Sequence, residues 1–182
     1  DVTVRNEWYY VETVSEHTTM MGSIIAGARG IAPRCRLLSV ELYGDAVSEM
    51  DWLLDNGVNV VNLSYGDTTP TGQYSSKSAY MDYIVNTYRI TIVASSGNTG
   101  EEDGYVANPG LGYNVLTVGA CSSSSSYASI FSSYKELSGP RKPNILAPGY
   151  SMNLIPFSGT QNGTSLSAAV TTGCIALMMD MN

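Results

Sequence analysis

The sequence predicts an α/β fold with three layers, in which a mostly parallel sheet carries helices on both faces. Short apolar runs of strand length alternate with segments whose apolar residues recur at helical spacing. That alternation is typical of parallel sheets. One run, Val58–Leu63, is apolar enough to be a strand buried on both faces. The 182 residues suit a single domain, and the sequence contains no repeat or interdomain linker.

The predicted elements alternate strand and helix along the first half of the chain. Alternation of apolar and polar residues predicts the first short strand, and helical spacing of apolar residues predicts each helix. Gly57 is expected to close the second helix, because glycine readily adopts the left-handed conformation found there. In order, the elements are the strand Asp1–Arg5, the helix His17–Ala28, the strand Leu37–Glu41, the helix Ala46–Asn56, the strand Val58–Leu63, the helix Ser78–Tyr88 and the strand Ile90–Ala94.

Composition narrows the classes of function. A net charge of −7 and a pI near 4.5 argue against a nucleic-acid partner or an anionic membrane surface. No segment approaches the roughly 18 apolar residues of a membrane span. Cys35, Cys121 and Cys174 lack metal-ligand spacing. Each lies in a run of apolar or small residues, so we expect three buried free thiols.

The most informative stretch is Gln161–Val170, a polar turn that runs into small residues at helical spacing. It places the Ser165 hydroxyl in the first turn of a buried helix. Unpaired N–H groups and the helix dipole stabilise negative charge that develops at such a position. Ser165 is therefore a candidate nucleophile. On this stretch alone, simple capping of the helix by Thr164 or Ser165 explains the same residues.

Several segments, taken in order, resemble those of the subtilisin-like serine peptidases, or subtilases. Asn162–Ser165 resembles the family's nucleophile motif, and Gly173 falls where the family has a helix glycine. The resemblance covers the chain from about His17 to Met179 and implies a subtilisin-like fold and a polypeptide substrate. The other matching segments are the histidine helix His17–Gly27, the substrate-binding strand Val60–Gly66, the strand Val93–Asn98 that ends in the oxyanion asparagine, and the two strand segments Val115–Ala120 and Lys142–Gly149.

The resemblance implies a role for three residues. His17, the only histidine, would be the general base and Ser165 the nucleophile. Asn98 would form the oxyanion hole with the Ser165 backbone N–H. Plainer explanations also exist, because a lone histidine is often structural and Asn98 suits the turn Gly97–Gly100.

Two segments that follow strands are implied to bind an extended peptide. Their glycines let a substrate backbone approach closely enough to be added as a strand. Asp67, beside them, could favour a basic substrate side chain, but a solvated loop carboxylate explains it more simply. The residues implied to bind substrate are Ser64, Tyr65, Gly66, Ser95, Ser96, Gly97 and, near the family's pocket floor, Ala107.

Two small departures from the family pattern leave the reacting groups in place. Thr18 follows the histidine where the family has glycine, and Ala169 stands where it has proline. In a further departure, only two residues separate Gly27 from Gly30, so the family's usual calcium loop is missing. We therefore expect no metal site and no cofactor, although the acidic run Glu101–Asp103 contains carboxylates of the kind that bind calcium.

The largest departure concerns the catalytic aspartate, which in the family ends a strand well upstream of the histidine. Only sixteen residues precede His17, and Asp1 opens a segment that resembles the family's second strand. We therefore expect a chain truncated at the N-terminus, and also at the C-terminus, that lacks this aspartate and is nearly inactive by itself.

The missing strand belongs between Leu37–Glu41 and Val58–Leu63. Without it, two buried rows of backbone groups would lack partners, at about 1–3 kcal/mol for each group. We expect the gap to be filled by a strand from another copy of the chain, by a separate N-terminal piece, or by a local rearrangement of the sheet.

The sequence thus predicts a serine endopeptidase that forms an acyl-enzyme on Ser165. The alternative is a non-catalytic, subtilase-like protein that binds peptides or has a structural role; the joint presence of His17, Asn98 and Ser165 favours the enzyme. An esterase of the α/β-hydrolase kind is a weaker alternative, because Gly163–Ser167 lacks the glycine that follows the serine of a nucleophile elbow. By resemblance, we expect the protein outside the cell or at its surface.

Overall fold

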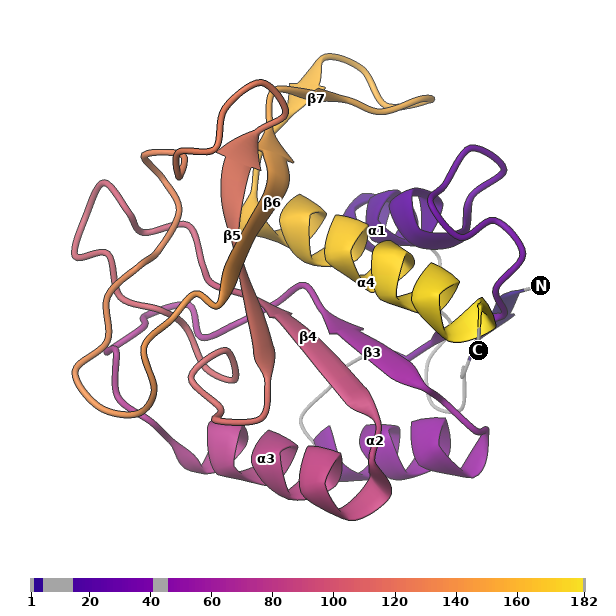
Figure 1. Ribbon diagram of the computed structural model, residues 1–182, viewed down its shortest axis with the longest axis horizontal. Coiled ribbons are helices and arrows are strands. Elements are labelled where there is room, and N and C mark those ends of the chain that lie inside the picture. The colour runs from indigo at the N-terminus through magenta and orange to yellow at the C-terminus, as the bar shows by residue number, and fades with distance from the viewer. Residues whose placement is uncertain (1, 5–14, 41–45, 182) are drawn as a thin grey trace.

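The computed structural model describes residues 2–4, 15–40 and 46–181 (Figure 1). Helices and strands alternate through the first part of the chain, as predicted, and the boundaries differ from the predicted ones by up to two residues wherever both lie in the described ranges. Asp1, Arg5 and Glu41 lie outside those ranges. The elements are β1 (Val2–Val4), α1 (Glu16–Ala26), β2 (Leu37–Ser39), α2 (Ala46–Asp55), β3 (Val60–Leu63), α3 (Ser76–Tyr88), β4 (Thr91–Ser95), β5 (Leu116–Ser122), β6 (Ile145–Tyr150), β7 (Met152–Asn153), β8 (Thr160–Gln161) and α4 (Thr164–Asp180).

A four-stranded parallel sheet with the order β3-β4-β5-β6 forms the centre of the fold. The register places Val61 opposite Ile92 and Val118 opposite Ile145. A separate parallel pair joins β1 to β2, and β7 pairs with β8 as a short antiparallel hairpin. The parallel strands end at a common edge, which brings the segments after β3 and β4 together.

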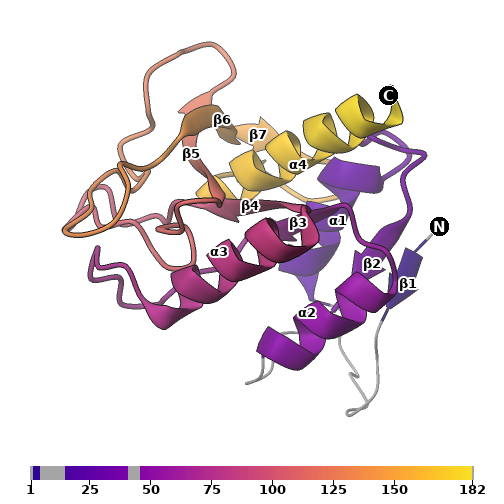
Figure 2. The ribbon, with the colours of Figure 1, turned by 60° about the horizontal axis from the view of Figure 1, so that its bottom comes forward.

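Helices cover both faces of the central sheet, which confirms the predicted α/β architecture. Helices α2 and α3 lie on one face, and α1 and α4 lie on the other (Figures 1 and 2). The central strand β4 has the dry core expected of this arrangement, since Ile92, Val93 and Ala94 are all 0% exposed. No helix in the part of the chain described here is both long enough and apolar enough to span a membrane.

Local chemistry explains where three of the helices begin or end. The Ser15 hydroxyl accepts from the Thr18 N–H at 3.2 Å and caps α1. Gly57, with a φ of 73°, closes α2 as predicted. Helix α4 has Gly163 as its N-cap, so neither Thr164 nor Ser165 is the capping residue.

The three cysteines are free thiols, but they are not all buried. Cys121 is buried and Cys35 is half-buried, whereas Cys174 is exposed. The expectation is therefore wrong for Cys174. Gly173 is the last buried residue of α4, and the residues that follow it are half-buried or exposed.

The strands β2 and β3 lie on either side of a gap. In the described part of the chain, β2 pairs only with β1 and β3 pairs only with β4. A cavity of about 910 Å³ is lined by both strands. Within these residues, then, the sheet does not rearrange to close the gap.

Candidate active site

Ser165 is the second residue of α4 and lies where β3 ends. Its hydroxyl donates to the Ser64 carbonyl at 3.1 Å, and the Ser64 hydroxyl donates to the Ser165 carbonyl at 2.9 Å. This reciprocal pair joins residues 101 positions apart in the sequence. It fixes the candidate nucleophile at the carboxyl edge of the central sheet.

Asn98 is held against the same helix terminus. Its side-chain oxygen accepts from the backbone N–H and from the hydroxyl of Thr164, both at 3.0 Å, so its NH₂ group points away from Thr164. A methyl group on Gly163 would lie 3.8 Å from the Asn98 Nδ2 and 3.9 Å from the Ser165 backbone nitrogen. Two N–H donors therefore border one space beside Gly163, as stabilisation of an oxyanion requires.

His17 is the second residue of α1, and its side chain is exposed. It lines the cavity between β2 and β3, as do Ser64 and Tyr65. Among the residues described, no hydrogen bond or ion pair to His17 is present. The structure thus brings His17 to the cavity that Ser64 also lines, while the Ser165 hydroxyl donates to Ser64 and not to the imidazole.

Ala107 lies between the segments that follow β3 and β4. A methyl group on Gly66 would come within 2.7 Å of the Ala107 Cβ, and one on Gly97 within 3.6 Å. Contacts this short require glycine at Gly66, and Gly97 also has a φ of 106°. The Ala107 methyl group therefore closes the space between the two glycine-bearing segments.

The other predicted substrate-binding residues differ in their exposure. Tyr65 is half-buried, and burial, followed by the negative charge of Asp67, raises the pKa of its phenol. Ser95 is buried at the end of β4. Ser96 is 0% exposed, donates its N–H to Val118 and accepts from Ala107. Ser96 therefore lies beneath the surface of the segment that ends β4, and it supports Gly97 from the inside.

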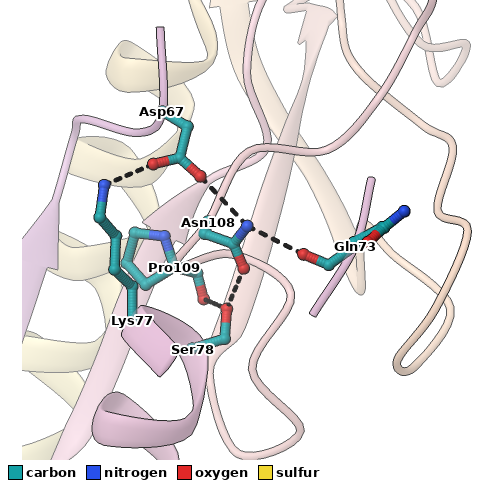
Figure 3. Close-up of polar contacts among 6 residues, drawn as sticks. All are labelled: Asp67, Gln73, Lys77, Ser78, Asn108 and Pro109. Atoms are coloured by element: carbon teal, nitrogen blue, oxygen red, sulfur yellow. Dashed lines mark hydrogen bonds and ion pairs between the residues drawn. The ribbon is translucent and has the colours of Figure 1, made fainter. Parts of the chain in front are cut away.

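The Asp67 carboxylate is engaged on both oxygens (Figure 3). One oxygen pairs with the Lys77 ammonium at 2.5 Å, and the other accepts from the Asn108 amide at 3.1 Å. Asn108 also donates to the Gln73 carbonyl and accepts from the buried Ser78 hydroxyl at 2.6 Å. Asp67 is thus neither free to select a basic substrate side chain nor simply solvated. It helps to hold the loop that contains Ala107 and Asn108.

Thr164 has a role that the sequence alone did not suggest. Its hydroxyl donates to Asn98 and accepts from the Gly97 N–H at 3.2 Å. It therefore orients Asn98 and fixes the end of β4 against α4. The signal available in the sequence was only its position, directly before Ser165.

The acidic run lies in an exposed loop. Glu101, Glu102 and Asp103 are all exposed, and Asp103 accepts from the Tyr105 N–H at 3.1 Å. Across the described ranges, no three His, Cys, Asp or Glu side chains lie close enough together to hold a metal ion.

A parallel α/β fold with a serine at a helix N-terminus, an amide donor beside it and a histidine helix on the same face is the architecture of a serine peptidase of the subtilisin type. The model of the subtilase family matches residues 1–182. The chain belongs to the subtilase family.

Individual relatives are similar over most of this chain. Subtilisin DY from Bacillus licheniformis is 28% identical, over 97% of this chain and 67% of its own length. Subtilisin Savinase from Lederbergia lenta is 30% identical, over 91% of this chain. The chain spans only 63% of Savinase and 44% of the alkaline protease of Alkalihalobacillus alcalophilus.

Solved structures show the same fold. The prenylagaramide maturation protease PagA superposes with a TM-score of 0.80 at 26% identity, and the match covers all of this chain and 68% of PagA. The PatG macrocyclase in complex with peptide gives a TM-score of 0.74 at 24% identity, over 91% of this chain and 53% of PatG.

Proposed function

We propose that this protein is a serine endopeptidase that cleaves peptide bonds through an acyl-enzyme on Ser165. The observation that supports this most directly is the pair of N–H donors, from Asn98 and from Ser165 itself, that border one space at the start of α4. Donors that are fixed before the reaction stabilise the charge that develops on the substrate oxygen.

In the proposed reaction, the Ser165 hydroxyl turns from the Ser64 carbonyl and transfers its proton to His17 as the oxygen attacks the scissile carbonyl carbon. The carbonyl oxygen becomes negative between Asn98 and the Ser165 N–H. His17 then protonates the leaving amine, and water releases the acyl group by the same steps in reverse. This chemistry uses side chains and backbone groups only and calls for no cofactor.

The proposed substrate is a polypeptide in extended conformation, bound along the segments that contain Gly66 and Gly97. The close approach of backbone at these glycines and the Ala107 methyl between them support this assignment. The alkaline protease and PagA named above are proteases, and the PatG macrocyclase structure is a complex with a peptide, which is consistent with a polypeptide substrate. The family resemblance also supports a location outside the cell or at its surface.

We further propose that residues 1–182 alone turn over slowly. No carboxylate is hydrogen-bonded or ion-paired with His17 in the part of the chain that the structure describes, so none there fixes the imidazole tautomer or stabilises the imidazolium. In subtilisin, loss of the aspartate costs about 3 × 10⁴ in kcat.

A non-catalytic peptide-binding protein is the second candidate. It is favoured by one observation, the hydrogen bond from the Ser165 hydroxyl to Ser64 in place of one to a base. Reaction of Ser165 with an active-site reagent would distinguish the peptidase from the non-catalytic peptide-binding protein.

The test is labelling with a fluorophosphonate, followed by peptide mapping. We expect slow labelling of Ser165, and a further drop of at least about tenfold in His17→Ala, because a positioned base contributes about 10²–10⁴-fold. Ser165→Ala is the control that must abolish the label. Label found in the serine run Ser122–Ser126, or an unchanged rate in His17→Ala, would contradict the proposal.

A further inference from the structure

The turn Gly97–Gly100 is held by a segment that follows β5 in the sequence. The Ser133 N–H donates to the Gly97 carbonyl at 3.0 Å, and the Gly100 N–H donates to the Phe131 carbonyl at 2.8 Å. Neither the turn nor the segment belongs to a helix or a strand. These cross-connections, and not regular secondary structure, therefore fix the backbone of the turn.

The side chain of Ser133 bonds the residue that follows Asn98. Its hydroxyl oxygen accepts from the Thr99 N–H at 3.1 Å and lies 3.1 Å from the Thr99 hydroxyl. The Thr99 hydroxyl gives its one proton to the Tyr105 carbonyl at 3.2 Å, so the Ser133 hydroxyl is the donor to Thr99. Ser133 thus forms a reciprocal pair with Thr99 while its N–H holds Gly97.

The Ser133 hydroxyl is committed entirely to this turn. The residue is 0% exposed, and among the described residues its hydroxyl bonds Thr99 alone. A methyl group on Gly97 would come within 2.9 Å of the Ser133 hydroxyl oxygen, so the turn packs directly against it. A buried hydroxyl is costly unless its donor and acceptor are both used. Here both are used on the turn.

The bonds of Ser133 lie on both sides of Asn98. The Gly97 carbonyl belongs to the peptide bond before Asn98, and the Thr99 N–H belongs to the peptide bond after it. Because peptide bonds are planar, holding these two groups fixes both planes that meet at the Asn98 Cα, and with them the direction of its side chain. Asn98 itself is exposed, so packing does little to hold it.

We propose that Ser133 is a positioning residue for the oxyanion hole, which holds the Asn98 NH₂ group where the substrate oxygen becomes negative. This role rests on the proposed function. Ser133 acts through the turn, because its hydrogen bonds go to Gly97 and Thr99 and not to Ser165. Oxyanion donors work by being in place before charge develops, and a displacement of about 1 Å can cost on the order of 10²-fold in rate.

The test compares Ser133→Ala with Ser132→Ala. Ser132 is 2% exposed, and its hydroxyl accepts from the Ala120 N–H of β5 at 3.0 Å, away from the turn. Each substitution leaves a buried N–H group without its acceptor, so both should lower the Tm by a similar amount. We expect fluorophosphonate to label Ser165 at least about tenfold more slowly in Ser133→Ala, but within about twofold of the wild-type rate in Ser132→Ala.

A double substitution separates positioning from general damage to the site. In Asn98→Ala no amide remains to be positioned, so adding Ser133→Ala should slow labelling further by less than about twofold. Amide exchange gives a readout that does not require Ser165 to react. The Thr99 N–H should exchange at least about tenfold faster in Ser133→Ala than in the wild type or in Ser132→Ala.

Thr99→Val tests the same link without removing a buried serine, so the inference stays testable even where Ser133→Ala does not fold. It deletes the hydroxyl that accepts from Ser133 and donates to Tyr105. We expect labelling at least about threefold slower than in the wild type. Thr99→Ser brings the hydroxyl back and should restore the rate.

The outcomes distinguish this inference from the proposed function. Labelling that Asn98→Ala slows but Ser133→Ala does not would overturn the inference and leave the proposed function intact. Equal slowing in Ser132→Ala and Ser133→Ala would also overturn it, as would the full slowing in the Asn98→Ala background, because Ser133 would then act without Asn98. A wild-type protein whose Ser165 does not label would contradict the proposed function, and this role with it.

Discussion

At the scale of single residues, the proposed function gives Asn98 two roles that substitutions can separate. Its side-chain oxygen accepts from Thr164, which orients it, and its NH₂ group lies beside the Ser165 N–H. Asn98→Asp keeps an acceptor for Thr164 but removes the donor. Asn98→Ala removes both.

We expect both Asn98 variants to label with fluorophosphonate at least about 10²-fold more slowly, since one oxyanion-hole donor contributes about 10²–10³ in rate. The Tm of Asn98→Asp should change little. Asn114→Ala is the matched control, because its amide bonds the Asp82 carbonyl away from the site. A wild-type labelling rate in Asn98→Asp would show that orientation of the loop, and not donation, is the role of Asn98.

At the scale of elements, the start of α3 supports the loop that contains Ala107. The Ser78 hydroxyl is 0% exposed and donates to the Asn108 side chain at 2.6 Å (Figure 3). Ser78→Ala leaves a buried acceptor unpaired, so we expect the free energy of unfolding to fall by about 1–3 kcal/mol.

Ser76→Ala in the same helix is the control. That serine is exposed, and its substitution should change the free energy of unfolding by less than about 0.5 kcal/mol. Urea unfolding of the two variants measures both values. Equal values would mean that the buried hydrogen bond contributes nothing beyond helix propensity.

Helices were more predictable from the sequence than the contacts between elements. The spacing of apolar residues in α1 and α2 and the closing Gly57 are local signals, and all three are confirmed. The hairpin of β7 and β8 was not predicted, because strands of two residues are too short to show a period. The contact of Thr164 with Asn98 joins residues 66 positions apart, which no local pattern specifies.

The meeting of the strand ends with the serine helix was predictable from the sequence, but the hydrogen bonds formed there were not. The strand ends and the serine helix meet at one edge, as the parallel topology requires, so Ser64, Gly97 and Ser165 come together. The donation from Ser165 to Ser64 depends on the side-chain torsion of the serine, which the sequence pattern does not determine.

At the scale of the whole molecule, one buried lysine makes stability depend on pH. Lys142 is 4% exposed and donates to the Val115 carbonyl at 2.5 Å and to the Asn144 side chain at 2.9 Å. Burial lowers its pKa from 10.5 to about 8, partly offset by the negative charge of Asp82.

Between pH 8 and pH 10.5 the unfolded chain keeps this proton while the folded chain releases it, so folding stability rises with pH in that window. Compared with Lys142→Met, we expect the wild-type free energy of unfolding to gain on the order of 3 kcal/mol from pH 7 to pH 10.5, at about 1.4 kcal/mol per pKa unit. Urea unfolding across this range measures the gain. Lys135→Met, at an exposed lysine, should follow the wild type, and a parallel curve for Lys142→Met would contradict the assignment.

The separation of β2 from β3 also divides the folding of the chain. In the sheet β3-β4-β5-β6 every strand lies beside its predecessor in sequence, so the sheet can grow by successive addition, each step closing a modest loop. Among the described residues, the pair β1 and β2 shares no backbone hydrogen bond with that sheet. It is held by side-chain packing: α1 packs against α4, and Leu38 of β2 packs against the core cluster that contains Val61. We expect the pair β1 and β2 to open more readily than the larger sheet, because no backbone hydrogen bond among the described residues ties it to that sheet.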